Sequence, residues 1–103
     1  MDQVSVIVVN WNGKELLSEC LGSLKKQAYP HFSTVLVDNG STDGSVDFVR
    51  KKFPEVRIMA LPENTGFSVA NNMAIRSVNS KYVALLNNDA VAHPLWLKNL
   101  VAA

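Results

Sequence analysis

The sequence contains a single cysteine, and none of its hydrophobic runs is long enough to cross a membrane. Because Cys20 is alone, an internal disulfide and any metal site built from several cysteines are excluded. The apolar run at residues 4–9 is far shorter than the ~20 residues of a membrane helix, and an acidic rather than a basic segment precedes it. We therefore expect a soluble, cytoplasmic protein, which in a full-length form could lie at the inner face of the membrane.

An excess of charge of one sign is also missing. Ten basic and nine acidic side chains give a formal net charge of +1. A protein that binds nucleic acid through a broad face normally carries a clustered excess of lysine and arginine. We therefore expect no nucleic-acid partner.

Familiar phosphate-binding signatures are absent as well. No G-x-G-x-x-G follows the first apolar run, and no G-x-x-x-x-G-K-[ST] occurs anywhere. These absences argue against a dinucleotide oxidoreductase and a P-loop NTPase. A phospho-receiver domain is equally disfavoured, because Asn10-Trp11-Asn12 and Leu61-Pro62 stand where it would carry acidic residues.

Four short apolar runs, rich in β-branched residues, alternate with four amphipathic patterns. The runs cover residues 4–9, 34–37, 56–61 and 82–86, and the helical patterns cover residues 16–24, 46–53, 67–78 and 93–103. Runs without strict alternation are typical of strands that are covered on both faces of a parallel sheet. The order predicts one α/β domain over residues 1–103, Rossmann-like, with three α/β/α layers and a mainly parallel sheet.

The helical patterns also predict which side chains face the sheet. At helical spacing, the apolar stripes are Leu16, Leu17, Cys20, Leu21 and Leu24; Ala70, Met73, Ala74 and Val78; and Leu97, Leu100 and Val101. Such a sheet leaves two edges uncovered, so self-association through an edge is expected. Because the sequence stops on a helix, we also expect it to be the N-terminal segment of a longer protein.

Polar and glycine residues follow each predicted strand. The four segments are Asn10-Trp11-Asn12-Gly13, Asp38-Asn39-Gly40-Ser41-Thr42-Asp43-Gly44, Pro62-Glu63-Asn64-Thr65-Gly66 and Asn87-Asn88-Asp89. Each one alone is typical of an ordinary turn. In open α/β sheets, however, ligands bind outside the carboxyl ends of the strands, where all four segments would meet. The pattern therefore predicts a binding site along this edge.

The individual loops suggest roles for particular side chains. Asp38 could accept hydrogen bonds from a ribose or a base, whereas Thr42 or Asp43 could cap the following helix. Gly66 permits close approach of the backbone to a ligand, at the start of a helix that could face an anion. At least one of Asn71 and Asn72 is expected to point inward, because asparagine is a poor helix former.

Four stretches, VSVIVVNWNG, VLVDNGSTDGS, ENTGFSVANNMAI and YVALLNNDA, resemble the amino-terminal half of family 2 glycosyltransferases, which have the GT-A fold. The resemblance covers essentially the whole chain, with four motifs in the family's order and spacing. Within the family, the chain is most similar to the bacterial rhamnosyltransferase-like branch. The resemblance implies an inverting hexosyl- or rhamnosyltransferase of cell-wall or polysaccharide biosynthesis. Its donor would be a UDP-, dTDP- or GDP-linked sugar and its acceptor a glycan or a lipid-linked hydroxyl.

The resemblance also implies a donor site. The residues that it places around the nucleotide sugar are Val9, Asn10, Asp38, Asn64, Gly66, Asn71, Asn72, Asn87, Asn88 and Asp89. Asp89 would match the second aspartate of the family's Asp-x-Asp motif and bind Mg²⁺ or Mn²⁺ that bridges the diphosphate. The chain departs from the motif at Asn87 and Asn88, which bring no charge.

No catalytic residue can be assigned within the chain. The family's general base is expected after Ala103, so activity of this segment alone is doubtful. A non-catalytic, truncated or degenerate binding module is therefore the alternative function. A related nucleotidyltransferase is less well supported, because such sheets open with a glycine-rich, basic loop and this loop has only Gly13 and Lys14.

Overall fold

The computed structural model describes residues 3–103, in which strands and helices alternate along the chain. The elements are β1 (Val4–Asn10), α1 (Lys14–Lys25), β2 (Phe32–Asp38), α2 (Ser45–Lys52), β3 (Arg57–Ala60), α3 (Phe67–Ser77), β4 (Tyr82–Leu85) and α4 (Trp96–Ala102). The predicted fold class, with four strands and four helices, is confirmed.

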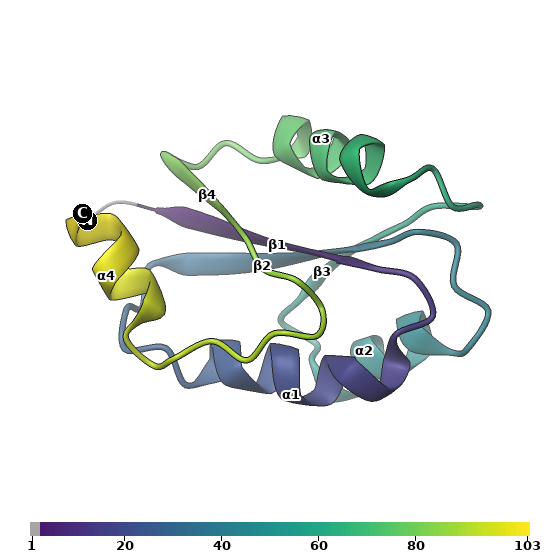
Figure 1. Cartoon of the computed structure of the whole chain (residues 1–103), viewed down its shortest axis with the longest axis horizontal. Coiled ribbons are helices and arrows are strands. Elements are labelled where there is room, and N and C mark those ends of the chain that lie inside the picture. The colour runs from purple at the N-terminus through teal and green to yellow at the C-terminus, as the bar shows by residue number, and fades with distance from the viewer. Residues whose placement is uncertain (1–2) are drawn as a thin grey trace.

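The four strands form one sheet in the order β3-β2-β1-β4, and every neighbouring pair is parallel. Helix α3 covers one face of this sheet, and α1 and α2 cover the other (Figure 1). Strand β1 is buried along almost its whole length, as a central strand between two helical layers should be. Because all the strands run in the same direction, their carboxyl ends lie at one edge of the sheet.

Two apolar cores hold the layers together. On the side of α1 and α2, alternate residues of β1 pack against Leu17, Leu21 and Val49. On the other side, Ile7, Val35 and Val37 pack against two alanines of α3, Ala70 and Ala74. The small alanine side chains let α3 approach the sheet closely, and together the two cores fix the position of every strand end.

Three residues of the predicted stripes, Leu16, Met73 and Leu100, lie outside the cores. Their exposed fractions are 46%, 37% and 49%, which contradicts the predicted burial. Each lies about a quarter turn from the centre of the buried side of its helix, at ~100° per residue. The predicted apolar stripes were therefore too wide, although the orientation of each helix was right.

The last strand and the last helix are shorter than the sequence predicts, and β4 ends at Leu85. Helix α4 begins at Trp96 instead of near Pro94, because residues 93–96 form a separate turn in which Trp96 N–H donates to the His93 carbonyl.

Strand β4 pairs with β1 and has no strand on its outer side within residues 3–103. Self-association through that edge stays a prediction. No helix in the part of the chain that the structure describes is long and apolar enough to span a membrane.

Candidate nucleotide-sugar site

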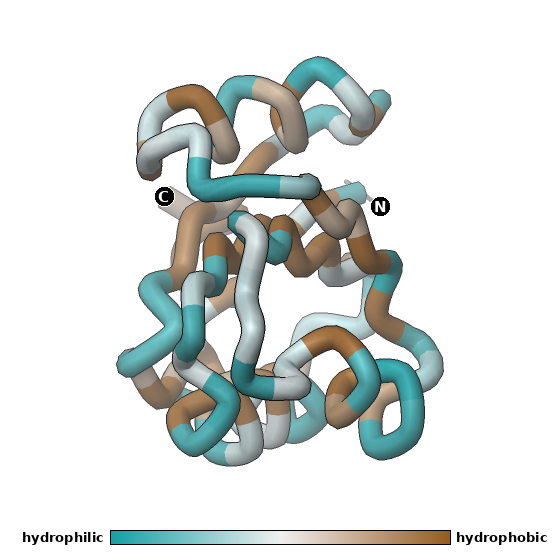
Figure 2. Tube along the Cα trace, turned by 90° about the vertical axis from the view of Figure 1, so that its right-hand side faces the viewer, coloured by the Kyte–Doolittle hydropathy of each residue, from teal (hydrophilic) through white to brown (hydrophobic). Residues whose placement is uncertain are grey.

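The carboxyl ends of β1 and β4 meet where the direction of winding of the sheet reverses. Strands β2 and β3 follow on one side of β1, and β4 lies on the other. Open α/β sheets bind ligands at such a switch point. Figure 2 looks at the molecule from this side and shows mainly hydrophilic and neutral loops crossing in front of the hydrophobic strands.

A cavity of about 360 Å³ opens at this edge, and we call it the rim cavity. Its lining residues are Val9, Trp11, Asn39, Asn64, Phe67, Asn87, Asn88 and Asp89. Five of them were among the predicted site residues, namely Val9, Asn64, Asn87, Asn88 and Asp89. Trp11 and Asn39 lie in two of the four segments predicted for this edge but were not among the predicted site residues, and neither was Phe67. Trp11 and Phe67 are 55% and 57% exposed. The sequence signal that could have identified them is an aromatic residue among polar residues, directly after a strand or at the first position of a helix.

Asn10 and Asp38 lie beneath the rim cavity and do not line it. Both are buried, and they are directly opposed in the pairing of β1 with β2. The Asn10 amide nitrogen donates to Asp38 Oδ1 over 3.0 Å. Ser41 donates to the same carboxylate through its backbone N–H (2.9 Å) and its hydroxyl (2.7 Å). In this structure the Asp38 carboxylate therefore stabilises the loop after β2.

Asn39 holds the loop after β3 in place. Its side-chain oxygen accepts hydrogen bonds from the backbone N–H and the hydroxyl of Thr65, and its amide nitrogen donates to the Gly66 carbonyl. Gly66 N–H donates to the side chain of Asn64, and its φ of 87° is a conformation that favours glycine. Asn39 thus orients the segment that carries Asn64 and Phe67 into the rim cavity.

The two asparagines of α3 differ in burial. Asn71 is buried, as was expected for at least one of the pair, and Asn72 is exposed. Neither lines the rim cavity. A role for them in binding the nucleotide sugar stays a prediction.

Cys20 lies beneath the turn at residues 87–89. It is fully buried, and its thiol donates to the Asn87 carbonyl over 3.5 Å. Burial, together with the nearby negative charge of Asp89, raises the pKa of the Cys20 thiol to about 11. The thiol is therefore protonated at neutral pH, which suits a hydrogen-bond donor and not a nucleophile.

Asp43 joins the starts of two helices. Its carboxylate accepts hydrogen bonds from the backbone N–H of Lys14, where α1 begins, and from the backbone N–H and hydroxyl of Ser45, where α2 begins. The N-cap position of α2 is Gly44, which has no side chain to cap the helix, and Asp43 instead binds the first helical residue from one position earlier. The slight burial of Asp43 alone would raise its pKa, but the hydrogen bonds from Ser45 and Lys14 outweigh burial and hold the pKa below its usual value.

This lowered pKa makes the stability depend on pH in a definite direction. Because the pKa is lower in the folded state than in the unfolded state, Asp43 stabilises the fold above about pH 4, and that stabilisation is lost as the pH falls through the folded-state pKa. We expect Asp43→Asn to be less stable than the wild type at pH 7, with the difference shrinking towards pH 3. Urea unfolding at a series of pH values measures this, and a difference that does not change with pH would contradict it.

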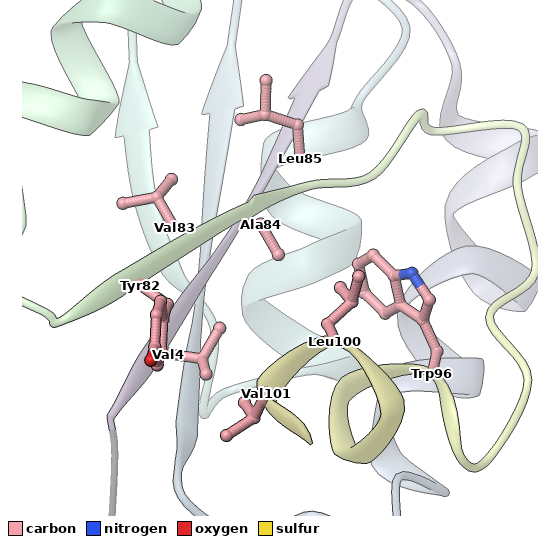
Figure 3. A pocket seen from close by; sticks show the side chains of 8 residues that line it. All are labelled: Val4, Tyr82, Val83, Ala84, Leu85, Trp96, Leu100 and Val101. Carbon is pink, nitrogen blue, oxygen red and sulfur yellow. The ribbon is translucent and has the colours of Figure 1, made fainter. Parts of the chain in front are cut away.

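A second hollow lies between β4 and α4, along the outer edge of the sheet. It has a volume of about 420 Å³, and its walls are mainly apolar side chains such as Val4, Val83 and Leu100 (Figure 3). Such walls offer few partners to a phosphate group. Compared with this hollow, the rim cavity is therefore the better candidate for a charged ligand.

Comparison with known proteins places this geometry in a family. The family model described as "Glycosyl transferase family 2" matches residues 5–103. The chain belongs to glycosyl transferase family 2. The resemblance seen in the four motifs is therefore confirmed at the level of the family, and the narrower likeness to rhamnosyltransferases stays a prediction.

Relatives of the chain include proteins named for teichuronic acid and teichoic acid. The chain is 35% identical over 89 residues to the putative teichuronic acid biosynthesis glycosyltransferase TuaG of Bacillus subtilis, and this match covers 84% of this chain and 35% of that protein. It is 33% identical over 93 residues to the teichoic acid poly(glycerol phosphate) polymerase of Staphylococcus epidermidis, and this match covers 86% of this chain and 13% of that protein.

Two solved structures superpose closely on the chain. The mannosyltransferase PcManGT of Pyrobaculum calidifontis, in complex with GDP-Man and Mn²⁺, gives a TM-score of 0.90 at 30% identity, over 97% of this chain and 31% of that one. S. aureus TarS 1-349 in complex with UDP-GlcNAc gives 0.89 at 30% identity, over 97% and 30%. The chain thus spans about a third of the length of these glycosyltransferases.

The side chains of the family 2 site suit a divalent cation that is shared with a ligand. Residues 3–103 contain no group of three His, Cys, Asp or Glu side chains that could hold a metal ion by itself. The rim cavity offers the Asp89 carboxylate and the side-chain amides of Asn87 and Asn88. Mg²⁺ is usually bound by one or two carboxylates that are completed by substrate phosphates and water. The donor set therefore fits Mg²⁺ or Mn²⁺ bound together with a diphosphate.

Proposed function

We propose that the chain is the donor-binding part of an inverting glycosyltransferase that uses a nucleoside diphosphate sugar. The transferred group would be a hexosyl or rhamnosyl unit, and the acceptor a hydroxyl of a glycan or a lipid-linked molecule. The single observation that carries this proposal is the rim cavity, in which the Asp89 carboxylate faces the same space as Trp11, Phe67 and several amides.

The charge of the rim cavity supports a cation as a partner of the donor. Among residues 3–103, no lysine or arginine lines it, and Asp89 is the one acidic residue that does. A diphosphate in such a cavity would lack a positive partner from the protein side chains. Mg²⁺ or Mn²⁺ held by Asp89 would supply that charge and stabilise the negative charge that develops on the leaving diphosphate. The solved complex of the mannosyltransferase with GDP-Man and Mn²⁺ supports this assignment.

The other side of the rim cavity suits a nucleoside. The rings of Trp11 and Phe67 are largely exposed, so each has apolar surface available for stacking on a base. Asn39 and Asn64 line the same space, and amides of this kind can donate to and accept from the edges of a base or a ribose. Asp38 would act on the nucleoside indirectly, because its carboxylate is already bound to Asn10 and Ser41.

In the reaction, the acceptor oxygen would bond to the anomeric carbon on the face opposite the diphosphate. The bond from this carbon to the diphosphate oxygen would break, and its electron pair would leave with the diphosphate. The hydroxyl proton would pass to a general base, which we expect outside residues 3–103. Within these residues, Asp89, Trp11 and Asn64 would bind and orient the donor.

Calorimetric titration of the chain with UDP, dTDP and GDP, with and without Mn²⁺, tests the proposal. We expect binding of at least one of them that is tighter with Mn²⁺ than without it. Asp89→Ala should remove this difference, because it removes the one charged ligand of the rim cavity. Asp47→Ala is the matched control, since Asp47 is an exposed acid on α2 and should leave binding unchanged.

The same titration separates the alternative function. Asn87, at the first acidic position of the motif, favours a non-catalytic module that has kept the fold and lost the donor. For such a module, none of the three diphosphates binds, and Asp89→Ala behaves like the wild type. That outcome would overturn the proposed function for this chain.

A further inference from the structure

The carboxamide of Asn10 links the two sides of the rim cavity. Its side chain is completely buried at the end of β1. Its nitrogen donates to Asp38 Oδ1 over 3.0 Å, and its oxygen accepts from the Asn88 side-chain nitrogen over 3.0 Å. One amide thus holds the loop after β2 and the turn after β4 at a fixed separation.

The turn at residues 87–89 needs such an attachment. The pairing of β4 with β1 ends at Leu85, and one more backbone hydrogen bond follows, from Leu86 to the Ile7 carbonyl. Beyond that point, the Asn88 side chain ties the turn to β1, and the Cys20 thiol holds the Asn87 carbonyl from below. The turn is closed by a bond from Ala90 N–H to the Asn87 carbonyl, and Ala92 N–H donates to the Ser23 hydroxyl just after it. On the side of β1, the position of the neighbouring Asp89 depends on the bond between Asn88 and Asn10.

Gly13 closes over the bond between Asn10 and Asn88. A methyl group built on Gly13 would lie 2.5 Å from the Asn88 side-chain nitrogen and 2.6 Å from the Asn10 side-chain oxygen. The backbone of Gly13 has a φ of −109°, which any residue can adopt. The glycine is therefore needed because of the space that the hydrogen bond occupies, and not because of its own conformation.

We propose that Asn10 is a positioning residue. Through its hydrogen bond to Asn88, which Gly13 covers, it fixes the distance between Asp89 and the nucleoside side of the rim cavity. This inference rests on the proposed function, because it assigns the bond to the binding of a metal–diphosphate pair. Outer-shell partners that orient metal ligands typically change metal affinity by about 10- to 100-fold when they are lost. In this proposal Asn88 acts mainly through its bond to Asn10, and Asp89 is the residue that would hold the cation.

Gly13→Ala tests the bond without changing any residue that lines the rim cavity. For each diphosphate, the readout is the ratio of its affinities with and without Mn²⁺, together with the affinity for uridine or guanosine alone. We expect Gly13→Ala to lower the Mn²⁺ ratio about tenfold and to leave nucleoside binding within about twofold. A role in stability alone would lower both affinities together. Gly22→Ala is the matched control, because an added methyl group there meets no atom within 4 Å.

Asn88→Asp gives a second test, with a sign that separates the two roles of Asn88. If Asn88 acts only as a ligand, an added carboxylate in the rim cavity strengthens the Mn²⁺ ratio. If its bond to Asn10 matters, the ratio falls, because the new carboxylate repels the Asn10 side-chain oxygen. Rotating the Asn10 amide does not relieve this, since its oxygen would then face the Asp38 carboxylate. We expect the ratio to fall, and this test serves even where Gly13→Ala does not fold.

The outcomes distinguish this inference from the proposed function. A wild type with no Mn²⁺-dependent binding overturns the proposed function, and the inference falls with it. A wild type that binds with Mn²⁺, with an unchanged ratio in Gly13→Ala or a raised ratio in Asn88→Asp, overturns only the positioning role of Asn10.

Discussion

Gly40→Ala is expected to destabilise the chain by about 3 kcal/mol, which combines backbone strain with steric overlap. Gly40 has a φ of 82°, a conformation that L-residues with a side chain rarely adopt. In addition, an added methyl group would lie 2.7 Å from two backbone atoms of Glu63 and 3.0 Å from the nitrogen of Asn64. Because these are backbone atoms of the neighbouring loop, they cannot move aside as the end of a flexible side chain could.

Gly44→Ala is the matched control, since it separates strain from overlap. Gly44 has a φ of 84°, almost the same as that of Gly40, but its added methyl group would meet only the Lys14 ammonium group, at 3.8 Å. We expect it to cost about 1 kcal/mol, the strain alone. Urea unfolding of the two variants measures the difference. Equal losses would show that the contact between the loops after β2 and β3 is not rigid.

Asp38→Ala should cost about 3 kcal/mol as well, for a different reason. Three donors, the Asn10 amide and the backbone N–H and hydroxyl of Ser41, would lose their acceptor. Asn10 is completely buried and Ser41 is partly buried, so the lost hydrogen bonds are only partly replaced by water. Charge-assisted hydrogen bonds of this kind contribute about 1.5–3 kcal/mol each, and they are not fully additive.

Thermal and urea unfolding of Asp38→Ala, beside Asp47→Ala, checks this expectation. Asp47 has an 80% exposed side chain and an ion pair of 4.0 Å with Arg50, so its removal should change stability by less than about 0.5 kcal/mol. If Asp38→Ala were as stable as Asp47→Ala, the carboxylate would not be holding the loop. A direct role at the ligand, as the sequence suggested, would then be favoured.

The fold could be predicted from the sequence because its signals are local. The β-branched runs and the helical spacings each indicate one element, and the alternation of strand and helix fixes a parallel sheet. The common edge for the four polar segments follows from that topology alone. The exposure of Leu16, Met73 and Leu100 could not be predicted, since it depends on how much of each helix the sheet covers.

The candidate site was predicted in part. Residues at or shortly after strand ends, such as Val9 at the end of β1 and Asp89 beyond β4, line the rim cavity as the topology predicts. The predicted role of Asp38 was incomplete, because its partner Asn10 comes to face it only when β1 and β2 are paired, whereas Ser41 bonds to it from three residues further along the same loop. The bond between Asn10 and Asn88 joins residues 78 positions apart, and no local pattern in the sequence indicates such a contact.

The two walls of the rim cavity also differ in the length of chain that each must close. The loop after β2 reaches the end of β1 through contacts that span 28 to 30 residues, between Asn10 and Asp38, Lys14 and Asp43, and Asn12 and Thr42. The turn that carries Asp89 reaches the same strand end across 78 residues. Since closure entropy grows with the logarithm of loop length, the longer loop costs about 0.9 kcal/mol more. The wall with the single carboxylate is therefore the one whose closure costs the chain more conformational entropy.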